Sequence, residues 1–93
     1  MDLKVSYNHT SNQTEAYKAA CEQITPDYIA KWNMKADISY NEPKSIVAEG
    51  KGFTLTLNFT DSAVEVACKL SLMLKPFKGK VLDTVENKLK KHV

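Results

Sequence analysis

The side chains able to catalyse a reaction or bind a metal ion are few in this chain, and they are scattered. The two histidines, His9 and His92, lie at opposite ends of the sequence, and no HxxE, HxH or Cys-His spacing surrounds either of them. Zinc and related metals need several ligands at close spacing, so we expect no metal site. Cys21 and Cys68 also lack the CxxC spacing of a redox or zinc motif, and we interpret both as reduced, buried thiols.

The only other stretch that could suggest chemistry surrounds two glycines. Glu49 and Lys51 flank this Gly50-Lys51-Gly52 stretch and could form a small polar site, although ordinary surface charge is the simpler interpretation. The stretch is too short for a phosphate-binding loop, because neither GxxxxGK[ST] nor GxGxxG is present. We therefore expect no catalytic site and no cofactor, and a protein that is not an enzyme.

Length and composition are typical of one small globular domain, which we expect residues 1–93 to form. All 13 basic residues are lysine, so the chain lacks the arginine side chain that best reads phosphates and guanine bases. The net charge is only +2, and together these features argue against a nucleic-acid partner. The start of the chain does not resemble a signal peptide, and no transmembrane segment is expected, so we predict a cytoplasmic protein.

The apolar pattern predicts an α+β fold in the order β-α-β-β-β-α. Apolar and polar residues alternate over residues 3–7 and 36–40, which predicts two short strands. A helix is expected from about residue 12 to 24, with a kink or break near Pro26 and a second short helix after it. Pro76 should end the last strand and begin a C-terminal helix. We expect a four-stranded, mostly antiparallel, curved sheet with the kinked first helix and the C-terminal amphipathic helix packed on one face.

The phase of the apolar residues changes in the middle of the predicted sheet. Ile46 and Ala48 are at even positions, whereas the apolar residues from 53 to 59 are at odd ones. A strand cannot change phase without an extra residue, so we interpret residues 50–52 as a glycine bulge that bends one long strand. Residues 64–74 then alternate without interruption. The edges of the segments 53–59 and 64–74 could pair between chains, which makes a homodimer one expected assembly.

A bent sheet beneath a long helix can enclose an apolar cavity, which would suit an apolar small molecule. A filled core is the alternative, and it is favoured because close packing leaves few voids in a small domain. The residues expected to line such a cavity are Trp32, Tyr40, Phe53, Leu55, Phe59, Val66, Leu70 and Phe77.

The predicted C-terminal helix has an apolar stripe and a lysine-rich face. The stripe repeats at every fourth residue from Phe77 to Val93. It could cover the sheet as a lid, or it could insert into an anionic membrane or granule surface. Lifting these side chains from the sheet would cost roughly 1.5 to 3 kcal/mol each, so the lid is favoured. The lysines expected to make any surface contact are Lys75, Lys78, Lys80, Lys88 and Lys91.

The sequence of residues 70–89, LSLMLKPFKGKVLDTVENKL, resembles a small bacterial family of polyhydroxyalkanoic acid system proteins. The Leu-Lys-Pro-Phe-Lys step and the apolar repeat after it carry the resemblance. It implies a cytoplasmic bacterial protein associated with polyester storage granules, in a family named without a demonstrated reaction. The plan of a sheet with a terminal helix is also similar to a trimmed helix-grip lipid-binding domain. Positions that fit the family at looser spacing are His9, Ala16, Trp32, Gly50 and Gly52.

Residues and resemblance together predict a non-enzymatic accessory protein of the polyhydroxyalkanoate storage system, which binds an apolar ligand or a partner protein. One alternative is a small helix-grip-like carrier of a lipid or acyl ligand. The other is a peripheral protein that contacts a granule or membrane surface through the lysine-rich C-terminal helix. The expected location is the cytoplasm, with association to storage granules.

Overall fold

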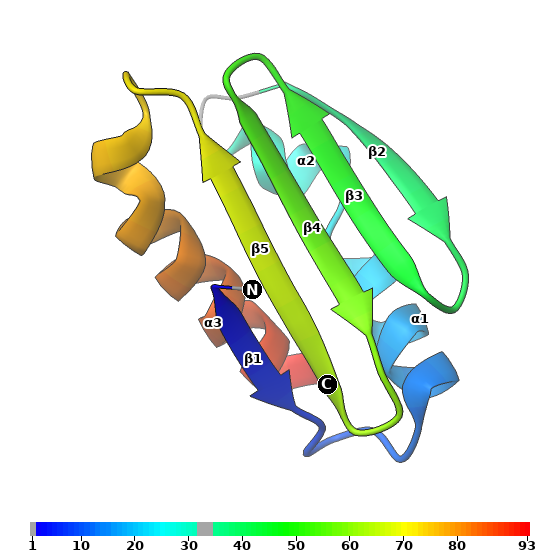
Figure 1. The fold of residues 1–93 in the computed structure, drawn as a ribbon. Coiled ribbons are helices and arrows are strands. Elements are labelled where there is room, and N and C mark those ends of the chain that lie inside the picture. Colours follow the sequence, from blue (N-terminus) through cyan, green and yellow to red (C-terminus); the bar gives the residue numbers. More distant parts are fainter. Residues whose placement is uncertain (1, 32–34) are drawn as a thin grey trace.

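The structure is a computed structural model that describes residues 2–31 and 35–93, so Trp32 of the predicted cavity lies outside the described residues. In this part of the chain, a five-stranded antiparallel sheet carries the helices on one face (Figure 1). This arrangement confirms the predicted α+β class, the antiparallel sheet and the C-terminal helix. The elements are β1 (Leu3–Ser6), α1 (Gln13–Gln23), α2 (Pro26–Ala30), β2 (Ala36–Asn41), β3 (Ser45–Gly50), β4 (Phe53–Phe59), β5 (Ala63–Leu70), the 3-10 helix η1 (Lys75–Phe77) and α3 (Lys78–His92).

The sheet has five strands instead of the predicted four, because residues 45–59 form a hairpin and not one bent strand. Gly50 pairs with Phe53 across a two-residue turn. Pairing across such a turn places even positions of β3 opposite odd positions of β4, so both apolar sets face the helices. Gly52 has a φ of 86° in this turn, a conformation that glycine adopts without steric cost. The prediction of a glycine bulge is therefore wrong, and a hairpin turn explains the change of phase.

The strands lie in the order β1-β5-β4-β3-β2, so β1 and β2 are the edges of the sheet. The segments expected to pair between chains are β4 and β5. β4 has a strand neighbour on both sides, whereas β5 has one on its outer side over residues 63–66 only. β1 covers the outer edge of β5 from the Leu3–Val66 pair to the Ser6–Ala63 pair, so pairing between chains at the remainder of β5 stays a prediction. A homodimer as such stays a prediction.

Local capping explains where the first two helices begin. The Asn12 side chain accepts a hydrogen bond from the Glu15 N–H at 2.9 Å, and its amide group donates to the Glu15 carboxylate at 3.1 Å. Thr25 caps α2 in a similar way, accepting from the Tyr28 N–H at 3.2 Å, and Pro26 occupies the first turn. The predicted start of the first helix and the break near Pro26 are confirmed.

The apolar layer between the sheet and the helices is one continuous cluster of buried side chains. Val85 and Leu89 of α3, and Val93 after it, are completely buried in this cluster, as is Leu55 of β4. The C-terminal helix is therefore a lid on the core, as its apolar stripe predicts. Phe77 is the exception, since 52 % of its surface is exposed.

The end of this lid is fastened to the loop that follows β1. The main-chain oxygen of Val93 accepts hydrogen bonds from the N–H groups of Asn8, His9 and Thr10 at 2.8, 2.9 and 3.0 Å. The Thr10 hydroxyl donates to the same oxygen at 2.9 Å. His9 thus takes part through its backbone, in the segment that follows β1. The contact joins the first strand to the last helix, two elements at opposite ends of the chain.

Candidate functional site

Four of the residues predicted to line an apolar cavity are core residues that are at most 5 % exposed: Phe53, Leu55, Phe59 and Val66. Leu70 is partly buried and packs against the same cluster. Tyr40 and Phe77 are 47 % and 52 % exposed. Tyr40 lies on the edge strand β2, and two strands separate β2 from β5, which precedes the segment with Phe77. The structure therefore gathers part of the set as packed core and leaves two aromatic rings outside it. The ligand cavity stays a prediction.

The aromatic residues near the first helix make structural contacts. The Tyr40 hydroxyl donates to the Ile24 carbonyl at 3.0 Å, which fastens the end of α1 to the edge strand. Tyr17 of α1 meets Phe59 of β4 edge to face, with 5.4 Å between the ring centroids. Burial raises the pKa of Tyr17 to about 12, so its hydroxyl stays neutral over the ordinary pH range. These rings hold helix and sheet together.

The side chains that could bind a metal ion are scattered in the described part of the chain. No group of three or more His, Cys, Asp or Glu side chains there could hold a metal ion. Both cysteines are free, with Cys68 buried and Cys21 only partly so. Burial raises the pKa of both thiols, which disfavours the thiolate that a nucleophile needs. Within the same described residues, no helix is both long and apolar enough for a membrane span.

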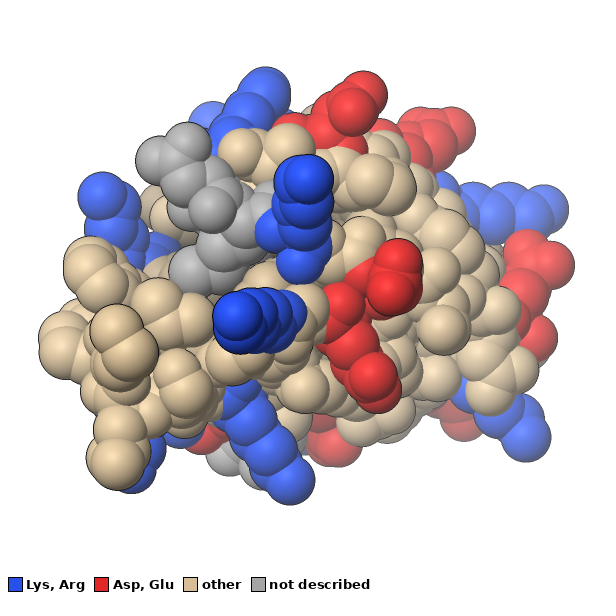
Figure 2. All heavy atoms as spheres, turned by 90° about the horizontal axis from the view of Figure 1, so that it is seen from above, with Lys and Arg blue, Asp and Glu red and all other residues tan. Residues whose placement is uncertain are grey.

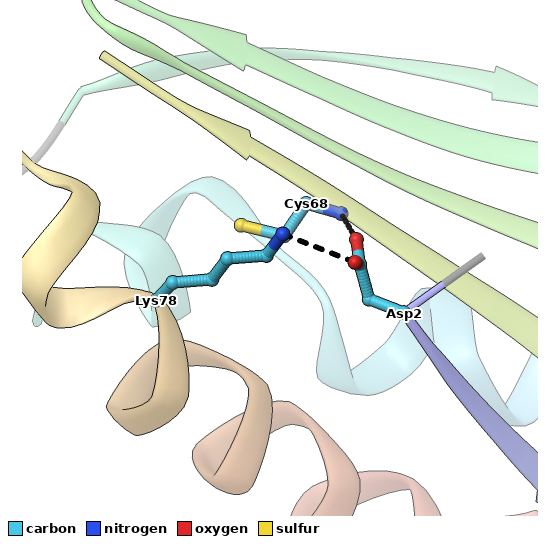
Figure 3. A network of polar contacts seen from close by, with 3 residues as sticks. All are labelled: Asp2, Cys68 and Lys78. Atoms are coloured by element: carbon cyan, nitrogen blue, oxygen red, sulfur yellow. Dashed lines mark hydrogen bonds and ion pairs between the residues drawn. The ribbon is translucent and has the colours of Figure 1, made fainter. Parts of the chain in front are cut away.

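One polar network joins the N-terminal segment, β5 and the start of α3 (Figure 3). The Asp2 carboxylate accepts a hydrogen bond from the Cys68 N–H at 2.8 Å and forms an ion pair with the Lys78 ammonium group at 3.0 Å. These contacts lower the pKa of Asp2 below its ordinary value of 3.8, with the Cys68 hydrogen bond contributing most. The Cys68 sulfur points away from the carboxylate, so the thiol takes no part in the network. The Asp2 carboxylate instead joins β5 to the start of α3.

A hollow between α2, the start of β2 and the β3–β4 turn contains the polar pair considered from the sequence. Glu49 and Lys51 both line it, together with residues of either charge such as Asp27 and Lys35. Mixed charges on an open surface of this kind are typical of solvated side chains, so the hollow is not our candidate site.

Among the described residues, three of the four exposed large apolar side chains lie in the connection from β5 to α3. Leu72 and Met73 are 83 % and 87 % exposed, and Phe77 follows at 52 %. We call residues 71–80 the tip. Three of the five lysines predicted for surface contact lie on it: Lys75, Lys78 and Lys80. Figure 2 looks onto this end of the molecule, where uncharged surface projects at the left with lysine side chains around it.

Hydrogen bonds give the tip a defined backbone. The Ser71 N–H donates to the Gly52 carbonyl at 2.7 Å, and the N–H groups of Leu74 and Lys75 both donate to the Ser71 carbonyl at 2.9 Å. The Phe77 N–H donates to the Leu74 carbonyl, also at 2.9 Å. The tip is therefore tied to the β3–β4 turn, and its exposed apolar side chains project from a fixed scaffold.

The other two lysines predicted for surface contact lie farther along α3. The Lys88 ammonium group is 5.3 Å from the centroid of the Tyr28 ring, a cation–π contact within the molecule. Lys91 is exposed in the last turn of the helix. They lie farther along α3 than the tip, so the tip contains three of the five lysines, and a contact surface formed by all five stays a prediction.

Sequence reasoning missed the tip because Leu72 and Leu74 continue the alternation of the strand before them. The predicted strand over residues 64–74 is too long, since β5 ends at Leu70. Leu70 pairs with Phe53, the first residue of β4, so no further partner is available in the sheet. One signal could have identified the segment: residues 66–82 contain four lysines and no acidic residue.

Comparison with known proteins identifies a matching protein family. A protein-family model described as "Putative polyhydroxyalkanoic acid system protein" matches residues 3–93, which includes every element of the sheet and all helices described above. No curated protein and no solved structure matches the chain.

Proposed function

The chain belongs to the family of polyhydroxyalkanoic acid system proteins, and from this premise we propose that it is a non-enzymatic accessory binding protein of the polyhydroxyalkanoate storage system. It acts in the cytoplasm at the surface of the storage granule, through its outer surface and not through a ligand held inside the fold. The observation that carries the proposal is the continuous buried core between the sheet and the helices.

A carrier of the helix-grip type needs an apolar space between its sheet and its terminal helix. In this protein the side chains of Leu55 and Leu57 from β4, and of Val85 and Leu89 from α3, occupy that layer with no exposed surface. A ligand could enter only by displacing them, and each large apolar side chain that loses its burial costs roughly 1.5 to 3 kcal/mol. The packed layer therefore supports binding at the outside of the molecule.

The polar groups of the interior support the same proposal. A cavity that holds a fatty or hydroxyacyl ligand usually places one or two polar groups toward the ligand's head group. Among the described residues, no buried side-chain nitrogen or oxygen lacks a hydrogen-bond partner. These groups are satisfied by the protein itself, as structural groups are.

Co-sedimentation with isolated polyhydroxyalkanoate granules tests the proposal. The purified protein should bind granules saturably at about 0.15 M salt, where weak surface charge attraction is largely screened. An unrelated protein of similar size and net charge serves as the control and should stay in the supernatant. In parallel, hydroxyacyl and fatty-acyl chains are titrated into the protein and followed by calorimetry, and no equimolar binding is expected. Failure to bind granules, together with equimolar binding of an acyl chain, would replace the proposal by an interior carrier.

A further inference from the structure

The tip has a feature that folding does not require. Leu72 and Met73 expose 83 % and 87 % of their surface, so neither side chain contributes appreciable burial to the stability of the fold. Phe77 exposes half of its ring beside them. Single exposed apolar residues are common, but three on one short, hydrogen-bonded segment form the kind of patch that marks a contact site.

The tip has positive charges at the start of α3, where helices ordinarily favour negative ones. The first turn of α3 contains no acidic residue, and no side chain caps it. Lys75, Lys78 and Lys80 surround this positive end of the helix dipole, where acidic residues are normally favourable. Among the described residues, only Lys78 of these three has a carboxylate partner, which is Asp2. Contact between the tip and an anionic surface would relieve this accumulation of positive charge.

We propose that the tip docks on an anionic phospholipid surface. Leu72, Met73 and Phe77 enter the region below the head groups, and Lys75 and Lys80 contact the phosphates. This proposal rests on the proposed function, because it names the element and the partner through which the protein reaches a surface. It leaves the apolar stripe of α3 in the core, so binding does not require the lid to lift.

The composition of the tip favours a lipid surface over a protein partner. Protein interfaces are enriched in aromatic residues, methionine and arginine and depleted in lysine. Met73 and Phe77 are of the enriched kinds, but three of the tip's ten positions are lysine and none is arginine. Apolar side chains flanked by lysines are instead typical of segments that lie at a membrane interface, where lysine stems cover apolar surface and their ammonium groups reach the phosphates. A bare polyester surface would use the apolar residues but would give the lysines no anionic partner.

Vesicle flotation with paired variants tests the apolar part of the proposal. The parent protein should float with vesicles of phosphatidylcholine and phosphatidylglycerol and stay behind with phosphatidylcholine alone. The double variant Leu72→Ser and Met73→Ser should lose more than about tenfold in affinity for the anionic vesicles. Its thermal unfolding should match that of the parent, because both side chains are exposed. Tyr40→Ser, which removes exposed apolar surface elsewhere, should keep the affinity of the parent.

A second pair of variants tests the position of the charges. Lys75→Gln with Lys80→Gln should lower the affinity for anionic vesicles roughly thirtyfold, from two phosphate contacts. Lys88→Gln with Lys91→Gln changes the net charge equally at a distance from the tip, and it should have a much smaller effect. Equal losses for the two pairs would show non-specific attraction and would overturn the assignment to the tip.

Other outcomes separate this inference from the proposed function. Parent protein that sediments with granules but does not float with anionic vesicles would overturn the lipid proposal and leave the granule proposal standing. If the tip variants then still bind granules, another surface of the protein carries that function. If they lose granule binding without any vesicle binding in the parent, the partner of the tip is the polyester or a granule protein.

Discussion

Lys78, in the first turn of α3, is ion-paired with Asp2 at 3.0 Å, so the start of the lid is fastened to the N-terminal segment (Figure 3). The same carboxylate accepts the Cys68 N–H, which adds the end of β5 to the contact. The tip lies between these attachments, and the Ser71–Gly52 hydrogen bond supports its other side. The segment that carries the exposed apolar side chains is thus anchored at both ends.

Replacing Asp2 by Asn should make the stability of the protein less sensitive to acid. The folded state lowers the pKa of Asp2, so its contribution is present above the ordinary value of 3.8 and is lost as the pH falls through the lowered value. Urea unfolding at pH 7 should show the variant less stable than the parent. The difference between their free energies of unfolding should shrink as the pH is lowered and vanish at the most acidic pH. Lys78→Gln keeps the Cys68 hydrogen bond and should retain part of this acid dependence. A parent and an Asp2 variant with parallel pH profiles would contradict the account.

The lid can be tested with the same substitution at a buried and an exposed leucine. Leu89→Asp places an unpaired charge in the core and should destabilise the protein by more than about 3 kcal/mol. Leu72→Asp changes a side chain that is 83 % exposed and should stay within about 0.5 kcal/mol of the parent. Chemical denaturation followed by circular dichroism measures both. Similar midpoints for the two variants would mean that α3 does not cover the core.

Local signals in the sequence were sufficient to predict the helices and the fold class. Asn12 and Glu15 have the spacing of a reciprocal cap, and both hydrogen bonds are present. The apolar repeat of α3 also identified its buried face, because a helix has one fixed period. The β3–β4 hairpin was harder, since a change of phase at two glycines fits either a bulge or a turn. Lys51-Gly52 also lacks the Asn-Gly or Asp-Gly pair that marks a two-residue hairpin.

The candidate site depended on information that no local pattern contains. Leu72 and Leu74 have the right phase to continue β5, and they leave the sheet only because β4 begins at Phe53. The length of a strand is set by its neighbour, which is a property of the whole sheet. For the same reason, the exposure of Phe77 at the head of a buried stripe was not predicted.

The glycines at residues 50 and 79 should respond in opposite ways to substitution by alanine. A Cβ at Gly50 would collide with the Phe53 ring and the Lys35 carbonyl, so Gly50→Ala should destabilise the protein. A Cβ at Gly79 would meet no atom within 4 Å, and alanine is the better helix former. Gly79→Ala should therefore raise the free energy of unfolding by about 0.5 to 1 kcal/mol. Thermal unfolding of both variants decides the matter, and a stabilising Gly50→Ala would show that the β3–β4 turn is packed differently.

Alkaline pH should destabilise the fold through its tyrosines. Burial raises the pKa of Tyr7 and Tyr17 to about 12 in the folded protein, and the Tyr7 hydroxyl donates a hydrogen bond to the Thr60 carbonyl at 2.6 Å. The stabilising effect of the neutral hydroxyls is present below the ordinary pKa of 10 and is lost as the pH rises from 10 to 12. The free energy of unfolding, measured across this pH range, should fall less for Tyr17→Phe than for the parent. An equal fall would indicate that Tyr17 ionises normally.

The most direct test of an outer binding surface over a packed interior is chemical-shift mapping of the backbone amides. The labelled protein is titrated with bicelles that contain anionic phospholipid, and each amide signal is followed. The account predicts that shifts and line broadening concentrate at residues 71–80 and at Gly52, which supports the tip. Changes centred instead on Leu55, Val85 and Leu89, with the tip unaffected, would place the ligand in the interior and contradict the account.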